Sequence, residues 1–218
     1  MNSPVIQQPG VKRARSVLLH GFAKPLVFGL MLLPLAWLFY AAAANELGAN
    51  PTEALIRSTG DWTLRALCLL LAVTPLRVIT GMPALARFRR MLGLFVYFYA
   101  TLHLLSYSWF DMGFGLQEIV QDIIKRPFIL VGFSAFLLLT PLALTSFNRA
   151  IKALGSRRWQ QLHKLIYGIA GLALLHFFWM RSGKNDFAEV FVYAGVLGVL
   201  LGWRILKFIR NRALAGAT

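Results

Sequence analysis

Two histidines stand in an otherwise strongly apolar stretch of the chain. The segment "WQQLHKLIYGIAGLALLHFFW", residues 159–179, carries His163 and His176 among aliphatic and aromatic side chains. Placing an imidazole in hydrocarbon costs free energy unless its ring nitrogens gain partners. The segment therefore indicates that each of these histidines is satisfied by something, either a neighbouring helix or a metal.

A third histidine, His103, lies in the similar segment "LFVYFYATLHLLSYSW". His103 and His176 each lie about 12 residues, or ~18 Å of helix, from the basic end of their segments. If both segments cross a membrane in the same direction, the two imidazoles lie at one depth. A haem iron takes two such imidazoles as axial ligands, with the porphyrin wedged between the helices. The alternative is that each imidazole only hydrogen-bonds to a neighbouring helix.

His163 requires a separate interpretation. It precedes His176 by thirteen positions, which is about 20 Å along an ideal helix and about 140° around it, so the two cannot share one metal. At the depth of His163, the segment that carries His103 offers Arg89 or Arg90 instead of a histidine. We therefore predict no second bis-histidine haem on these two helices. Three roles stay open for His163: an interface residue, a contact to a haem propionate, or an alternative ligand.

The basic residues near these segments also have two interpretations. Arg89 and Arg90 are typical of positive anchors on the cytoplasmic side of a membrane. The alternative is that they pair with haem propionates or with a flavin phosphate. His20, which lies among basic residues before the first apolar block, is interpreted as an interfacial residue and not as a ligand.

The apolar composition predicts that the segments carrying the histidines are membrane-spanning helices. Of the 218 residues, 58% are hydrophobic and the mean hydropathy is +0.63. The apolar residues form blocks of about 20, the length that crosses a ~30 Å hydrocarbon core as a helix. We predict an all-α polytopic membrane protein with six transmembrane helices and a short amphipathic surface helix in "FGLQEIVQDIIK". The predicted spans are 25–44, 62–80, 92–110, 128–147, 162–180 and 188–207.

The charges predict the orientation of this bundle. The net charge is +15, but the basic residues lie between the apolar blocks, which favours a topological role over nucleic-acid binding. If both termini are cytoplasmic, seventeen of the 23 Lys and Arg residues face the cytoplasm, and all eight acidic residues face the other side. The predicted parts are a cytoplasmic segment 1–24, a membrane domain 25–207 and a cytoplasmic tail 208–218. The residues assigned to the outer side are Arg57, Arg65, Lys125, Arg126, Arg181 and Lys184, together with Glu46, Glu53, Asp61, Asp111, Glu118, Asp122, Asp186 and Glu189.

The chain lacks the residues that several other kinds of chemistry require. The single cysteine, Cys68, lies in an apolar block, and the chain has no CxxCH motif for covalent haem attachment. It also has no dinucleotide-binding fingerprint. No acidic residue lies in the middle of a predicted span, which argues against a proton-coupled transporter. If the chain binds a haem, its electrons are then expected to come from a membrane quinol or from a separate flavoprotein.

In the segments around these histidines the chain resembles the MsrQ (YedZ) family, the haem-binding membrane subunits of periplasmic protein-methionine-sulfoxide reductase systems. That family belongs to the ferric-reductase-like transmembrane group. The segments that carry the resemblance cover about half of the chain, in the family's order. They are "VTPLRVIT" (73–80), "RRMLGLFVYFYATLHLLSY" (89–107), "KRPFILVGF" (125–133), "PLALTS" (141–146) and "RRWQQLHKLIYGIAGLALLHFFW" (157–179).

The resemblance implies a bacterial inner-membrane protein that binds haem b, and FMN has also been associated with the family. Such a protein passes electrons from the quinone pool to a periplasmic molybdopterin-containing subunit, which reduces methionine sulfoxide in oxidised proteins. By position, His103 and His176 match the haem ligands, and His163 matches a further histidine of the motif. Relatives that hold two haems carry a histidine pair on each of two helices. Arg89 or Arg90 replaces one of those four histidines here.

Two other functions stay as alternatives. One is a stand-alone transmembrane ferric or oxygen reductase fed by a separate flavoprotein. The other is a small transporter or structural membrane protein whose histidines bind no cofactor. In the interpretation we favour, the catalytic site lies on the partner, because the only cysteine is buried in the membrane and offers no methionine-sulfoxide chemistry.

Overall fold

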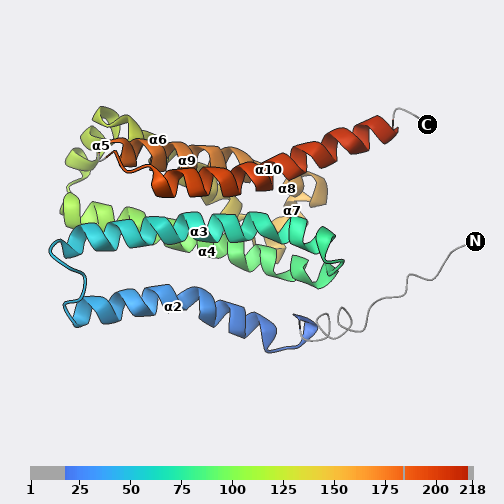
Figure 1. The fold of residues 1–218 in the computed structure, drawn as a ribbon, viewed down its shortest axis with the longest axis horizontal. Helices are drawn as coiled ribbons and strands as arrows, with labels where there is room; N and C mark the ends of the chain where they lie inside the picture. The colour runs from blue at the N-terminus through green and yellow to red at the C-terminus, as the bar shows by residue number, and fades with distance from the viewer. Residues whose placement is uncertain (1–17, 184, 216–218) are drawn as a thin grey trace, which may run out of the picture.

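The computed structural model describes residues 18–183 and 185–215. Every regular element in this part of the chain is helical, and the long helices run side by side (Figure 1). Six helical segments are long and apolar enough to cross a membrane, which confirms the predicted all-α polytopic architecture. They are Ala23–Ala43 (α2), Pro51–Ile79 (α3), Pro83–Asp111, Pro127–Leu144 (α6), Ser156–Ser182 and Ala188–Ala215 (α10).

Two of these segments are composite. The third joins the 3-10 turn η1 (Pro83–Phe88), helix α4 (Arg89–Ser106) and the π-helical turn η2 (Tyr107–Asp111). The fifth joins α8 (Ser156–Leu162) to α9 (Leu165–Ser182). Two short helices complete the fold: α5 (Leu116–Lys125), which confirms the predicted amphipathic helix, and α7 (Asn148–Leu154).

Helix α3 begins eleven residues earlier than the predicted span, at Pro51. The stretch "NPTEALIRSTGD", which we predicted as a connection, is helical from its second residue. The Asn50 side chain caps the helix by accepting from the Glu53 backbone N–H at 3.1 Å. Pro51 occupies the first helical position, and Glu53 pairs with Arg57 at 2.7 Å, one turn further on. A side-chain cap and a proline at the first position are helix-start signals, and an i,i+4 ion pair stabilises the first turns. The early start of α3 therefore has a local cause.

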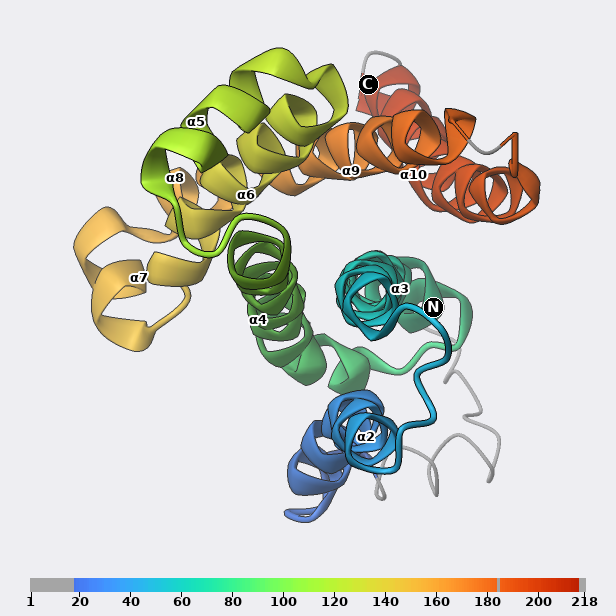
Figure 2. The ribbon, with the colours of Figure 1, turned by 90° about the vertical axis from the view of Figure 1, so that its left-hand side faces the viewer.

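The helices pack as two antiparallel pairs. Helix α3 packs most extensively on α4, and α6 on α9, while α10 contacts both α9 and α3. Figure 2 shows α2 on the far side of α3 and α4 from the other pair. Leu67, Val96 and Tyr99 are each 1% exposed at the α3–α4 interface. The Tyr99 hydroxyl donates to the Met31 carbonyl at 2.6 Å and so ties α2 to α4.

The two ends of the bundle differ in charge. One end holds the start of α3, η2, α5 and the α9–α10 connection, and all the acidic residues lie toward it (Figure 1). The start of α2 and the end of α10 lie at the opposite end. We call these the outer and the inner end, following the charge-based prediction. Helix α10 continues through residues 208–215, which we predicted as a tail, whereas Lys184 and most of segment 1–24 lie outside the described residues.

The orientation can be tested by cysteine labelling. In a Cys68→Ala background, Gln117→Cys would place a thiol on exposed α5 at the outer end, and Ser156→Cys would place one at the inner end. If the basic end is cytoplasmic, a membrane-impermeant maleimide labels Gln117→Cys in right-side-out vesicles and Ser156→Cys only in inverted vesicles. The same two proteins in the opposite vesicles are the controls, and the reverse pattern would contradict the orientation.

Candidate functional site

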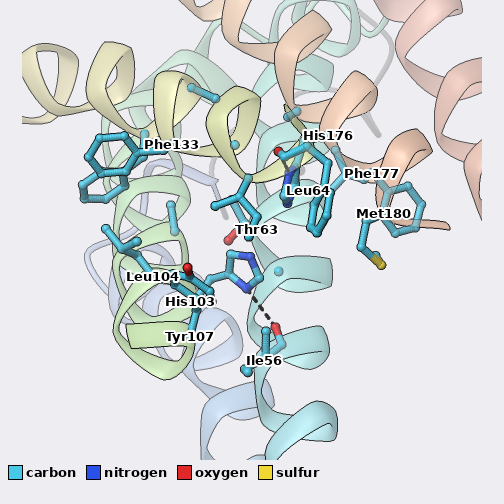
Figure 3. Close-up of a pocket in the computed structure, with 18 of the residues that line it drawn as sticks. Ile56, Thr63, Leu64, His103, Leu104, Tyr107, Phe133, His176, Phe177 and Met180 are labelled. Carbon is cyan, nitrogen blue, oxygen red and sulfur yellow. Dashed lines mark hydrogen bonds between the residues drawn. The ribbon is translucent and has the colours of Figure 1, made fainter. Parts of the chain in front are cut away.

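A cavity of about 650 Å³ lies between the two helix pairs. This volume falls within the roughly 300–1,000 Å³ of small-molecule and cofactor sites. Its walls come from α3, α4, α6 and α9, and they are mostly aliphatic and aromatic, with Leu64, Phe133 and Phe177 among them (Figure 3). The cavity is therefore suited to a large, mainly apolar group held between helices.

His103 of α4 and His176 of α9 project into this cavity from opposite walls (Figure 3). Their ring centroids are 6.2 Å apart, with an angle of 72° between the ring planes. Each histidine lies near the outer end of its helix. The structure thus brings together the two imidazoles that the depth argument placed at one level.

Each of the two imidazoles is fixed by one hydrogen bond to a backbone carbonyl. His103 Nδ1 lies 2.8 Å from the Ile56 carbonyl oxygen on α3, and His176 Nδ1 lies 2.6 Å from that of Phe128 on α6. A carbonyl oxygen can only accept, so Nδ1 carries the proton in both rings. In a neutral imidazole this leaves Nε2 with a free lone pair, which is the form that binds a metal.

This arrangement fits a haem better than a bare metal ion. In the described part of the chain, no group of three or more His, Cys, Asp or Glu side chains is placed to hold a metal. Two imidazoles suffice when a porphyrin supplies the other four nitrogens. Metal–imidazole bonds measure about 2 Å and each ring centre lies about 1 Å beyond its nitrogen, so axial rings on one ion lie roughly 6 Å apart. The observed 6.2 Å meets this requirement.

His163 lies away from the cavity, between α8 and α9. His163 and Lys164 interrupt the helix between α8 and α9, inside the segment Ser156–Ser182 that contains the predicted span 162–180. His163 Nε2 lies 3.2 Å from the Thr145 hydroxyl oxygen, and its ring centroid is 4.0 Å from that of Trp159. The Trp159 indole N–H donates to the Thr145 carbonyl at 2.9 Å. These contacts match an interface role, one of the three that the sequence left open.

The predicted arginines lie at the inner end. Arg90 donates to the Asn148 side-chain oxygen at 2.6 Å, and Arg89 is close enough to His163 for electrostatic interaction. Neither arginine lines the cavity around His103 and His176. The structure therefore brings Arg89 near His163, and neither of them near the other two histidines.

Two other arginines line the outer mouth of the cavity; the sequence placed them on the outer side but predicted no cofactor contact for them. Arg57 pairs with Glu53, and Arg126 pairs with Asp122 at 2.9 Å. Asp122 also accepts from the Tyr107 hydroxyl at 2.7 Å. The helix-start signal at Asn50 would have revealed Arg57, because it extends α3 outward and puts Arg57 two turns inside that helix.

Comparisons with known proteins show the family of the chain. Residues 59–174, which hold His103 and His163, match the family described as "Ferric reductase like transmembrane component". The match covers more than half of the chain, which is therefore a ferric-reductase-like transmembrane protein. No solved structure matches the chain.

More similar relatives identify the family within this class. The "Protein-methionine-sulfoxide reductase heme-binding subunit MsrQ" of Polaromonas naphthalenivorans is 74% identical over 86% of this chain and 86% of its own length. Proteins of the same name from Bordetella pertussis and Herminiimonas arsenicoxydans are 50% and 49% identical over 89% of this chain, and over 94% and 91% of their own lengths. The chain therefore belongs to the MsrQ family.

An interface role for His163 can be tested through Thr145. Thr145→Val removes the hydroxyl partner of His163 Nε2 and also the bond from that hydroxyl to the Pro141 carbonyl of the preceding helix. Each lost hydrogen bond typically costs about 1 kcal/mol. We expect a lower midpoint of thermal unfolding in detergent. Thr140→Val on the same helix is the matched control, because its hydroxyl bonds the Phe136 carbonyl of its own helix. Equal midpoints for the two variants would contradict the role.

Proposed function

We propose that this chain is the haem b-binding electron-transfer subunit of a protein-methionine-sulfoxide reductase system, with His103 and His176 as the axial ligands. The observation that carries the proposal is the 6.2 Å ring separation, with both Nδ1 atoms engaged by carbonyls and both Nε2 atoms left free. The names of its relatives, each a "heme-binding subunit", support it.

The chain's own residues would bind and insulate the cofactor. Bound haem iron supplies reversible one-electron transfer. His103 and His176 would present Nε2 lone pairs in a fixed orientation, and the mostly apolar walls would surround the cofactor. Arg57 and Arg126 at the outer mouth would balance the propionate charges, because guanidinium groups pair well with carboxylates. Arg89 and Arg90 stay as the propionate or flavin-phosphate contacts predicted for the inner end.

Catalysis is assigned to a partner. Cys68, the only cysteine, lies half-buried on α3, which leaves no thiol chemistry for methionine sulfoxide. Because both histidines lie near the outer ends of their helices, electrons would leave at that face. The proposed acceptor is a periplasmic molybdopterin-containing reductase subunit, with this chain in the bacterial inner membrane. The proposed donor is a membrane quinol or a flavin reductase, and FMN stays a prediction from the resemblance with no residue assigned to it.

The ligand assignment predicts the spectra of three variants. Purified protein expressed with added haem should show b-type bands in its reduced-minus-oxidised spectrum. His103→Ala and His176→Ala should each lose most of the haem, since a single imidazole is left on the iron. His163→Ala is the matched control, and it should keep the bands if His163 is an interface residue.

Three outcomes would count against this proposal. Full spectra in His103→Ala and His176→Ala would overturn the ligand assignment. Colourless wild-type protein would support a transporter or structural protein. Partner-independent reduction of ferric iron by the wild type would favour the stand-alone reductase.

The partner surface can be tested at α5. The outer segments 111–126 and 181–189, which we predicted as loops between spans, carry acidic residues, and Glu118 is exposed on α5. Glu118→Lys should slow electron delivery to the added catalytic subunit, because charge reversal weakens an electrostatic encounter, and it should leave the haem spectrum unchanged. Lys152→Glu at the inner end is the control. Equal delivery rates for the two variants would contradict a docking role for this surface.

A further inference from the structure

We propose that Gly60 and Gly132 are positioning residues for His103 and His176. Each glycine leaves accessible the backbone carbonyl that fixes the tautomer and the orientation of the histidine packed against it. The inference rests on the proposed function where it concerns haem, while its geometric part concerns the protein alone.

Gly60 lies directly against the His103 ring. A Cβ atom built on Gly60 would come within 3.0 Å of His103 Cε1 and 3.1 Å of its Nδ1. The carbonyl that holds this Nδ1 belongs to Ile56, four residues before Gly60 on the same helix. A methyl group at position 60 therefore meets the ring at the nitrogen that makes the bond.

Gly132 repeats this arrangement in the second helix pair, with less room. A Cβ atom there would lie 2.7 Å from His176 Nδ1 and 2.8 Å from its Cε1. The carbonyl that holds this Nδ1 belongs to Phe128, again four residues before the glycine. The same spacing thus recurs on α3 and α6, which meet different histidines.

Helix geometry explains the spacing of four. Side chains on a helix tilt toward its N-terminus and cover the turn before their own Cα atom. A side chain at position 60 would therefore cover the Ile56 carbonyl, and one at position 132 would cover that of Phe128. Each carbonyl has two lone pairs, so it can accept from the imidazole as well as within its own helix. Glycine at the fourth position leaves that second lone pair open to the approaching ring.

The other glycines in the bundle show that this contact is not general. A Cβ atom on Gly93 would meet only Leu70 at 3.8 Å, which is an ordinary van der Waals distance. Gly168 and Gly171, on the same helix as His176, would meet nothing within 4 Å. The two glycines that crowd an imidazole are those aligned with the two carbonyl bonds.

The positioning has a chemical consequence. A carbonyl that accepts from Nδ1–H sets the ring orientation and makes Nε2 a stronger electron donor to a metal. Stronger donation stabilises ferric over ferrous iron. Displacing the ring from its carbonyl should therefore raise the reduction potential of the bound haem and favour a ferric form with only one imidazole attached.

A double-mutant cycle tests the geometry without any cofactor. In haem-free protein, Gly132→Ala should lower the midpoint of thermal unfolding, and more than Gly60→Ala, because its contact is closer. In a His176→Ala background the ring is gone, so Gly132→Ala should no longer lower the midpoint. The same should hold for Gly60→Ala in His103→Ala. Gly171→Ala is the control, and alanine there should be neutral or stabilising because it favours helix.

Haem-loaded protein supplies the second measurement. Gly132→Ala and Gly60→Ala should raise the reduction potential and increase the high-spin fraction of the ferric spectrum, whereas Gly171→Ala should match the wild type. Haem properties equal to those of Gly171→Ala, or equal midpoint losses with and without the histidine, would overturn the positioning role. A wild type without haem would overturn the proposed function, and the haem-free cycle would still decide whether the glycines position the rings.

Discussion

The donation of each imidazole Nδ1–H to a backbone carbonyl is the interaction on which the site depends. A histidine in an apolar core is costly until its nitrogens have partners, and these bonds satisfy one nitrogen in each ring. They also connect α4 to α3 and α9 to α6, the two most extensive helix contacts in the described bundle. The two bonds that fix the tautomers therefore also cross the two main helix interfaces.

The features that follow from chain-long patterns could be predicted from the sequence. Hydropathy blocks gave six spans, and counting residues from the basic ends placed His103 and His176 at one depth, where the structure has them 6.2 Å apart. This worked because rise per residue is nearly constant in a helix. The amphipathic α5 was equally visible in its periodicity.

The features that depend on which faces meet could not be predicted in the same way. No sequence pattern distinguishes Gly60 and Gly132 from the other glycines. Their role depends on which histidine of a neighbouring helix packs against that turn. The contact of His163 with Thr145 likewise depends on how the start of the fifth span meets the end of α6. The early start of α3 is different, because the sequence contains its signal in Asn50. The predicted span missed it because its bounds follow hydropathy alone.

The two histidines belong to separate helix pairs, and this has a consequence for how the membrane domain holds together. Beside the cavity, α4 meets α6, with Tyr97 and Phe136 stacked at 5.4 Å. A group bound by both imidazoles would act as a crosslink between the halves, and its binding free energy would add to their cohesion. Cofactor supply would then govern how long the protein survives in the membrane, because chains lacking the crosslink open more readily to proteolysis.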